Sequence, residues 1–593
     1  MPMQKPQDTD TMTDAEKVAW LMRCMASLEA QNDALAKQAS DFAADMAAAN
    51  SRIADLERRL AEERAEKLRL IEQVRLASMR YFGRKSERAV PGQMPLFNDP
   101  EAESDDSAAE PGIDDALPKK PRRRGGKRVI DYDRLETVVV EHEIPAEQLA
   151  CPECGCVMSE MKVEVTRRLR MVPAHLVVEE HRRHVYKCSE CCGANAAGGE
   201  NKAVIARAPQ PEPPIPGSFA TASLLSWIIN AKYSNSMPLY RIEADLKTIG
   251  ANISRQNMAN WVVNVHARWL SKVHARLKAE LLSHDLMHAD ETRIQVLREP
   301  GRAPESMSYM WLFCSSAHDV PVYAYEYHPT RGKSVPEDFL RGWEGTLTTD
   351  GYGPYYTLAN GKVTNTCCLV HIRRKFAEIV KAAGGDAKCA GADSVALEGR
   401  RRIDAMFKVD RGFDGMAAEE RKAARERELR PLMEAFSEWV AAQVPKASPG
   451  LALDKALRYA RDYWPYMMNV LSDGRLALDN NIAERAIKPF VIGRKNWMFS
   501  NTPKGAEASA AIYSIVTTAK MNGLNPRLYV EWLLEEMPNA GELTDDVVDG
   551  FMPWSDKVPE SLHMSAKAAA KAKEMADDPI VDVDPAFLEG EDH

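Results

Sequence analysis

The sequence predicts a multidomain protein that combines α+β and α/β units with extended helical segments. Three features carry this prediction: a heptad repeat near the N-terminus, two cysteine pairs at metal-ligand spacing, and a series of strand-like segments that begins near residue 284. The chain has 593 residues, of which 45% are apolar. It is therefore long enough for about three to five structural units with at least one large core.

No apolar run approaches the roughly 18 residues that span a membrane, and the polar start of the chain contains no signal-peptide stretch. We therefore expect a cytoplasmic protein. The formal net charge is −9, but the charge is segregated. Residues 99–118 and the tail 555–593 are acidic, whereas seven Lys and Arg residues lie between Lys119 and Arg128. The acidic mean is therefore compatible with a basic part that contacts nucleic acid.

Residues 14–80 are predicted to form one long helix with a coiled-coil seam. Apolar residues alternate in steps of four and three from Leu21 to Leu60, and Asn32 is the exception among the core positions. A lone core Asn commonly fixes the register of a dimer, so we expect a homodimer or a larger homo-oligomer. The alternative is an alanine-rich helix that packs on its own chain.

Residues 81–128 are predicted to be a basic segment followed by a disordered linker. Flexible chain rich in Arg and Gly can lie in a narrow minor groove of DNA. The candidate DNA contacts in this segment are Arg84, Lys85, Arg122, Arg123 and Arg124. A solvated charge run without a partner is an equally good interpretation.

Residues 135–200 are predicted to be a small zinc ribbon. Two C-x-x-C pairs bracket strand-like alternation, and four thiolates suit a closed tetrahedral zinc site, which is structural rather than catalytic. A unit this small buries little apolar surface and gains stability from such a staple. The expected Zn²⁺ ligands are Cys151, Cys154, Cys188 and Cys191. The alternative is a set of reduced, buried cysteines.

Residues 217–280 are predicted to be helical, with Gly250 closing one helix and Ser254 capping the next. A helix, a turn and a capped helix can form a helix-turn-helix DNA-binding region. A plain helical bundle fits the same pattern equally well.

From residue 284 the pattern changes to strands. Three strand-like segments with short turns predict an antiparallel meander, and a fourth strand ends at Asp350, just before a glycine turn. A fifth strand and a basic helix follow. Three antiparallel strands followed by alternating helix and parallel strand are typical of the ribonuclease H-like fold. The first and fourth strands of that fold are neighbours, so Asp290 on the first strand is expected to converge with Asp350.

A third carboxylate of this fold comes from a later helix. The predicted core therefore has two parts, 284–384 and 476–535, separated by a helical insert over 385–475 and followed by a C-terminal segment, 536–593, with its acidic tail. In the second part, Asn480 or Asn481 is expected to cap a helix, and Pro489 to end or kink it. Glu484 lies in the first turns of this helix, and Asp479 competes with it on pattern alone.

Three converging carboxylates suit Mg²⁺ or Mn²⁺, because hard cations prefer oxygen ligands. Two such ions about 4 Å apart can activate the attacking oxygen and stabilise the leaving oxygen in an in-line displacement at phosphorus. The residues therefore point to metal-dependent phosphodiester chemistry.

Ordered motifs run through the chain. They are Phe82–Arg88, the two cysteine pairs, Pro238–Arg241, Asn260-Trp261, His288–Thr292, Thr349–Tyr352, Val370–Phe376, Asp479–Arg485, Gly493–Trp497, Ala519–Gly523 and Pro553-Trp554. Over about residues 70–554 the sequence thus resembles the large transposase subunit of the bacterial insertion sequence 66 family.

The resemblance implies a DD(E) transposase with a ribonuclease H-like catalytic domain, acting on terminal inverted repeats and target DNA. It implies the catalytic and magnesium-binding set Asp290, Asp350 and Glu484, with two ions per active site. It also implies accessory proteins encoded by the same element, and a bacterial cytoplasmic location with nucleoid association when bound.

Basic residues near the acids are candidates for contacts with phosphate groups. They are His371, Arg373, Arg374, Arg494 and Lys495. A plain surface role is as good an interpretation for each. Two other functions stay open: a ribonuclease H-like nuclease or resolvase that cuts without joining strands, and a non-catalytic, zinc-containing DNA-binding regulator.

Overall fold

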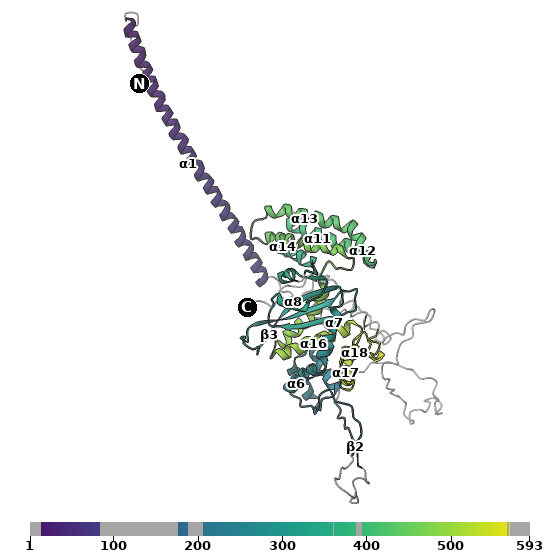
Figure 1. Cartoon of the computed structure of the whole chain (residues 1–593). Helices are drawn as coiled ribbons and strands as arrows, with labels where there is room; N and C mark the ends of the chain where they lie inside the picture. The colour runs from purple at the N-terminus through teal and green to yellow at the C-terminus, as the bar shows by residue number, and fades with distance from the viewer. Residues whose placement is uncertain are drawn as a thin grey trace, which may run out of the picture.

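The computed structural model describes residues 13–82, 176–187, 205–359, 361–386, 389, 394–565 and 568–569. Figure 1 shows one long helix, α1, projecting from a body of mixed sheet and helices. No helix in the described residues is long and apolar enough to cross a membrane. Some predicted site residues lie outside the described residues: Cys151, Cys154, Cys188, Cys191, Arg84, Lys85, Arg122, Arg123 and Arg124.

Helix α1 runs over Asp14–Phe82, and its heptad seam is open to solvent. Leu21 is 53% exposed, Leu28 59% and Phe42 67%. Because no other described segment covers these side chains, the alternative of a helix packed on its own chain gains no support. Oligomerisation through this seam stays a prediction.

A six-stranded mixed sheet forms the centre of the body, in the order β5-β4-β3-β6-β7, with the short β8 paired to the end of β3. Strands β3, β4 and β5 are antiparallel, whereas β6 and β7 run parallel to β3. The predicted meander and the contact between the first and fourth strands are both present. The strands are β3 (Leu286–Val296), β4 (Met307–Ser315), β5 (Tyr323–His328), β6 (Gly345–Thr349), β7 (Val363–Cys367) and β8 (Phe499–Ser500). A separate two-stranded ribbon pairs β1 (Val185–Lys187) with β2 (Ile205–Arg207).

The helices before the sheet share a single hydrophobic core with it, rather than forming a separate bundle. The Ser254 side chain caps α6, as predicted, by accepting a hydrogen bond from Asn257 N at 3.2 Å. These helices are α4 (Ala222–Ile229), the π-helix η3 (Asn230–Ser234), α5 (Leu239–Thr248), α6 (Arg255–Val265), the π-helix η4 (His266–Leu270) and α7 (Ser271–Leu281). Packing of α7 and α16 on β5 makes the sheet and the helices one unit.

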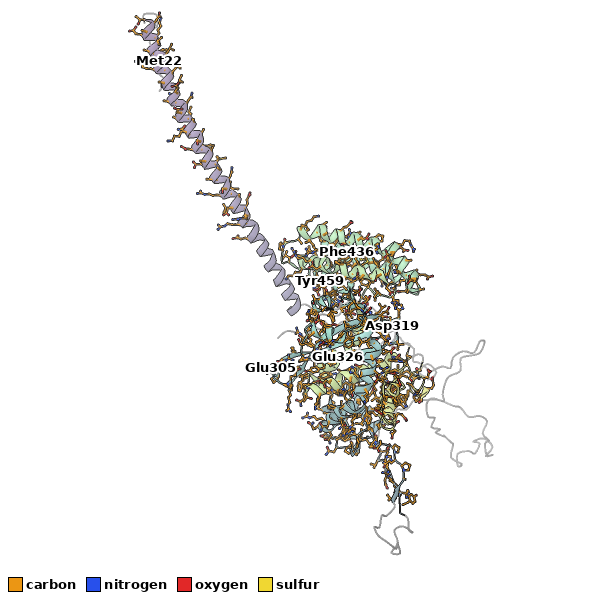
Figure 2. The ribbon with its side chains drawn as sticks, viewed as in Figure 1. Met22, Glu305, Asp319, Glu326, Phe436 and Tyr459 are labelled. Atoms are coloured by element: carbon orange, nitrogen blue, oxygen red, sulfur yellow. The ribbon has the colours of Figure 1, made fainter. Side chains whose placement is uncertain are left out.

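The insert is a helical layer with a second hydrophobic core. Figure 2 shows Phe436 and Tyr459 within this layer, next to the sheet. Arg425 is fully buried there, and its Nε donates to Asp410 Oδ1 at 2.7 Å. The helices that share this second core are α9 (Leu369–Ala382), which precedes the insert, and α11 (Val395–Arg411), α12 (Ala418–Ala424), the π-helix η6 (Arg425–Leu429), α13 (Arg430–Gln443), α14 (Ala452–Met467) and the 3₁₀ turn η8 (Met468–Ser472) within it.

After the insert, α15 crosses the sheet next to β3, and of the two predicted effects of Pro489 the helix end is absent. Pro489 does not end α15, which continues to Trp497, because the buried side chains on both sides of the proline pack into the main core. The remaining elements are α8 (Ser334–Phe339), η5 (Gly353–Thr357), α15 (Asn481–Trp497), α16 (Pro503–Met521), α17 (Pro526–Glu536) and α18 (Asp545–Asp549).

Candidate active site

The register of the sheet brings Asp290 and Asp350 to the same edge. The parallel ladder of β3 and β6 pairs His288 with Thr348. Asp290 and Asp350 each lie two residues further along, and the strand period of two puts both on the same face. Both side chains are half-buried.

A tight turn after β6 holds Asp350. Tyr352 N donates to Asp350 Oδ1 at 2.9 Å, and the Tyr356 hydroxyl donates to the Asp350 carbonyl at 2.7 Å. Gly351 is required here by close approach, because a Cβ would lie 1.9 Å from the hydroxyl of Tyr459 on α14. A helix of the insert therefore packs directly on the turn that carries the second acid.

Glu484 lies in the first turn of α15 and is 2% exposed. The Asn480 side chain fixes the start of this helix to β3, since its Nδ2 donates to the Ala289 carbonyl at 2.8 Å and its Oδ1 lies 2.9 Å from His288 Nδ1. The expected side-chain cap from Asn480 is therefore absent, because the amide is engaged with the strand. This tertiary contact brings the third acid beside Asp290.

Burial and neighbouring carboxylates raise the pKa values of Asp290 and Glu484. The pKa of Asp290 is well above its usual range because of burial, and then because of the charges of Glu291, Asp350 and Glu484. Burial also raises the pKa of Glu484 to about 7, although the nearby Arg374 guanidinium opposes the rise. The acids are thus close enough to feel one another's charge in a poorly solvated place.

A divalent cation fits this arrangement. Glu484 Oε2 is buried, and no described residue forms a hydrogen bond with it. The donors are carboxylate oxygens, the ligand type of hard cations, and a cation would relieve their repulsion. Asp479, the competitor on pattern, accepts a hydrogen bond from Asn481 N at 3.0 Å, so one of its oxygens is engaged by the start of α15.

Glu291 follows Asp290 in the chain but is already paired. Its Oε1 accepts from Arg331 Nε at 2.8 Å and Nη2 at 2.6 Å, and its Oε2 accepts from the Tyr355 hydroxyl at 2.6 Å. The Arg331 guanidinium also lies 3.8 Å from the ring centroid of Tyr352. Sequence reasoning missed this network, which joins β3 to the turn of Asp350.

Cys368 and His371 lie beside Glu484, which sequence reasoning also missed. Cys368 Sγ is 4.0 Å and His371 Nδ1 is 3.6 Å from Glu484 Oε1. Among the described residues, these three side chains place possible metal ligand atoms within 4.8 Å of one another. Burial, then Arg374 and Lys375, lowers the pKa of His371 to about 3, so its ring is neutral near pH 7. The available signal was the C-x-x-H spacing, which puts both residues on one face of a helix start.

The candidate phosphate contacts are less open than expected. Arg373 pairs with Asp404 of α11 at 2.6 Å, and Arg374 Nη2 lies 3.9 Å from Glu484 Oε2. Arg494 turns inward, with its Nη1 3.1 Å from Thr292 Oγ1 and also bonded to the Arg293 carbonyl. Of the predicted contacts within the described residues, only Lys495 is exposed.

Comparison with known proteins gives consistent matches along the chain. The family models are "Transposase IS66 family" over residues 217–508, "zinc-finger binding domain of transposase IS66" over 148–192, "IS66 C-terminal element" over 514–554, and "Transposase C of IS166 homeodomain" over 69–140.

Three uncharacterized proteins of Sinorhizobium fredii are similar. Protein y4jD is 29% identical over 70% of this chain and 79% of its own length. Protein y4hP is 27% identical over 85% of this chain and 88% of its own length. Protein y4qI is 27% identical over 90% of this chain and 97% of its own length. Four IS66 models match successive parts of the chain between residues 69 and 554, and they show that the chain belongs to the IS66 family of transposases.

Proposed function

We propose that the protein is a DD(E) transposase that binds the terminal inverted repeats of an insertion sequence and catalyses DNA cleavage and strand transfer with two metal ions. The observation that carries this proposal is the convergence of Asp290, Asp350 and Glu484 from three separate elements. The strand order β5-β4-β3-β6-β7, with β6 parallel to β3, supports a ribonuclease H-like core.

Asp290, Asp350 and Glu484 would hold two Mg²⁺ or Mn²⁺ ions. Such ions supply Lewis acidity to the attacking and leaving oxygens of an in-line displacement. The chain itself fixes the carboxylates: Asn480 ties Glu484 to β3, and Tyr356 holds the turn of Asp350. Burial of Glu484 at 2% exposure limits its contact with bulk solvent, which strengthens its charge interactions.

Two displacements at phosphorus complete the reaction. In the first, water attacks the phosphodiester at the element end, the P–O3′ bond breaks, and the 3′ oxygen leaves as a hydroxyl. In the second, this 3′ hydroxyl attacks a target phosphodiester and displaces another 3′ oxygen. Both steps exchange one ester bond for another P–O bond, so no covalent intermediate with the protein is required.

The match to the IS66 zinc finger spans all four paired cysteines. We propose that Cys151, Cys154, Cys188 and Cys191 hold one structural Zn²⁺, because four thiolates leave no open position for catalysis. We further propose that the protein works with accessory proteins encoded by the same element, and that α1 holds copies of the chain together in a homo-oligomer.

The test uses the full-length protein with a supercoiled plasmid that carries the element ends, in Mg²⁺ buffer. Asp290→Asn, Asp350→Asn and Glu484→Gln are each expected to reduce cleavage by about 10³-fold or more, because each loses several kcal/mol of transition-state stabilisation. The matched control is Asp338→Asn, whose side chain on α8 is 64% exposed. DNA affinity of all four variants is expected to stay near that of the unsubstituted protein.

The products separate the rival functions. Joined donor and target molecules support a transposase, whereas cleaved ends without joined products would identify a nuclease or resolvase. Cleavage that survives all three substitutions would overturn the catalytic assignment, and DNA binding without cleavage would indicate a regulator.

A further inference from the structure

The C-terminal end of α15 packs against the π-helix η3, and a lysine lies at this contact. Lys232 Nζ is 5.0 Å from the ring centroid of Trp497 and 5.2 Å from that of Tyr233. The side chain is half-buried, and nothing in the described part of the chain gives it an ion pair or a hydrogen bond. A cation held by aromatic faces, without a carboxylate, is ready to bind an anion.

Two strained residues lie beside this lysine. Ser236 and Met498 have φ angles of 56° and 67°, and no other non-glycine residue in the described chain has a positive φ. Asn496 joins the two segments, since its Nδ2 donates to the Ser236 carbonyl at 3.1 Å. Such backbone conformations cost free energy and concentrate at functional sites.

The strained turn at Met498 leaves apolar side chains at the surface. Met498 is 68% exposed and Phe499, the first residue of β8, is 45% exposed. Lys495 on the last turn of α15 is also exposed. We call Lys232, Lys495, Met498 and Phe499 the α15-end patch. Ammonium groups next to an exposed aromatic ring suit a nucleic-acid strand, because phosphates pair with the cations while a sugar or base packs on the ring.

The patch lies along the same strand as Asp290. Phe499 pairs with Gln295 of β3, and Arg494 bonds to Thr292 on the way. Gln295 is five residues beyond Asp290, which is about 17 Å at roughly 3.4 Å per residue. Since one strand of duplex DNA advances about 3.4 Å per nucleotide, this distance corresponds to about five nucleotides.

We propose that the α15-end patch binds the sugar-phosphate backbone of DNA about five nucleotides from the cleaved bond, with Lys232 contacting a phosphate. The inference rests on the proposed function, because the distance is measured from Asp290. It assigns a DNA contact to a single residue, Lys232, in the helical region before the sheet, for which the sequence predicted either a helix-turn-helix or a plain helical bundle. Burial lowers the pKa of Lys232 to about 8, which a bound phosphate would oppose.

The first experiment measures binding of the full-length protein to a fluorescein-labelled DNA duplex of about 30 base pairs, by fluorescence anisotropy across a NaCl series. Lys232→Met keeps the length and apolar stem of the side chain but removes the charge. We expect the slope of log affinity against log salt to fall in magnitude by about one. Lys232→Arg is expected to restore the slope. The control is Lys557→Met, because Lys557 is exposed and follows the acidic helix α18.

A second measurement needs no substitution at the lysine. Lysine acetylation of the unsubstituted protein, followed by mass spectrometry, is expected to show that the duplex protects Lys232 and leaves Lys557 reactive. Phe499→Ala is expected to weaken binding several-fold without changing the salt slope, because it removes an uncharged contact.

The outcomes distinguish this inference from the proposed function. If the unsubstituted protein does not bind the duplex, both fail. If it binds, but Lys232→Met keeps the original salt slope and the duplex does not protect Lys232, only the inference about the α15-end patch is overturned. If Lys232→Met fails to fold, the protection experiment alone decides.

Discussion

Replacing Glu484 by Gln is expected to stabilise the magnesium-free protein above neutral pH while it removes activity. The folded-state pKa of Glu484 is about 7, compared with an ordinary value of 4.5. A group whose pKa is raised on folding contributes stability that is complete below pH 4.5 and is lost as pH rises through about 7. At about 1.4 kcal/mol for each unit by which the folded and unfolded pKa values differ, the ionised Glu484 lowers the free energy of unfolding by about 3 kcal/mol at pH 8.5.

The side chain is 2% exposed, so solvent screening does little to reduce this cost. Gln has the same shape without the charge and removes the penalty. A divalent ion at the three acids should also offset it, and saturation at a hundred times Kd stabilises a protein by about 2.7 kcal/mol. Glu484→Gln should therefore lose much of the stabilisation by Mg²⁺ while gaining stability without it.

The assay is urea unfolding followed by tryptophan fluorescence at pH 5 and 8.5, with and without Mg²⁺, and with trace Zn²⁺ in every buffer. Trp311 is fully buried in the sheet and reports its unfolding. The control Asp338→Asn should change neither the pH dependence nor the response to Mg²⁺. If Glu484→Gln destabilises the protein at pH 8.5, or if Mg²⁺ stabilises it as much as the unsubstituted protein, Glu484 is a structural acid and the reasoning fails.

Two further predictions concern the support of the site and the zinc. Arg331→Met leaves the buried Glu291 without its cation. Because Arg331 is 39% exposed, we expect the free energy of unfolding to fall by about 2 kcal/mol, rather than by the ~3–5 kcal/mol of a fully buried pair. Adding Glu291→Gln should restore most of this free energy, as measured by urea unfolding, and equal losses in the single and double variants would contradict the pairing. We expect elemental analysis of the purified protein to find about one zinc ion per chain and Cys151→Ser to lose it, whereas an unchanged zinc content in the variant would show that Cys151 is not a ligand.

The sheet and two of its acids could be predicted because both depend on local pattern. Strand-like runs and short turns identify the meander, and the order of elements makes β3 and β6 neighbours. Once these strands are adjacent and parallel, Asp290 and Asp350 must approach each other. No information from distant parts of the chain is needed for this step.

The third acid and its surroundings depend on contacts that local pattern does not contain. Asn480 has the residue type of a helix cap, but its amide binds β3 instead. Pro489 has the residue type of a helix stop, but core packing carries α15 past it. Arg373 has the charge of a phosphate contact, but Asp404 in the insert neutralises it. In each case a tertiary partner decides the role, and the sequence does not show that partner.

The long insert between Asp350 and Glu484 is compatible with a well-defined site because it packs on the turn of Asp350 and because its flanking segments meet just before Glu484. Loop-closure entropy grows slowly, at about 0.6 kcal/mol for each doubling of length, so a long insertion costs little in free energy. Tyr459 of the insert packs against Gly351, next to the second acid. The core segments that flank the insert are joined directly, since Leu369 N donates to the Leu478 carbonyl at 2.8 Å, between the start of α9 and the segment just before Glu484. The insert therefore supports the turn of the second acid, and mutations in the core of the insert should reduce activity without touching a carboxylate.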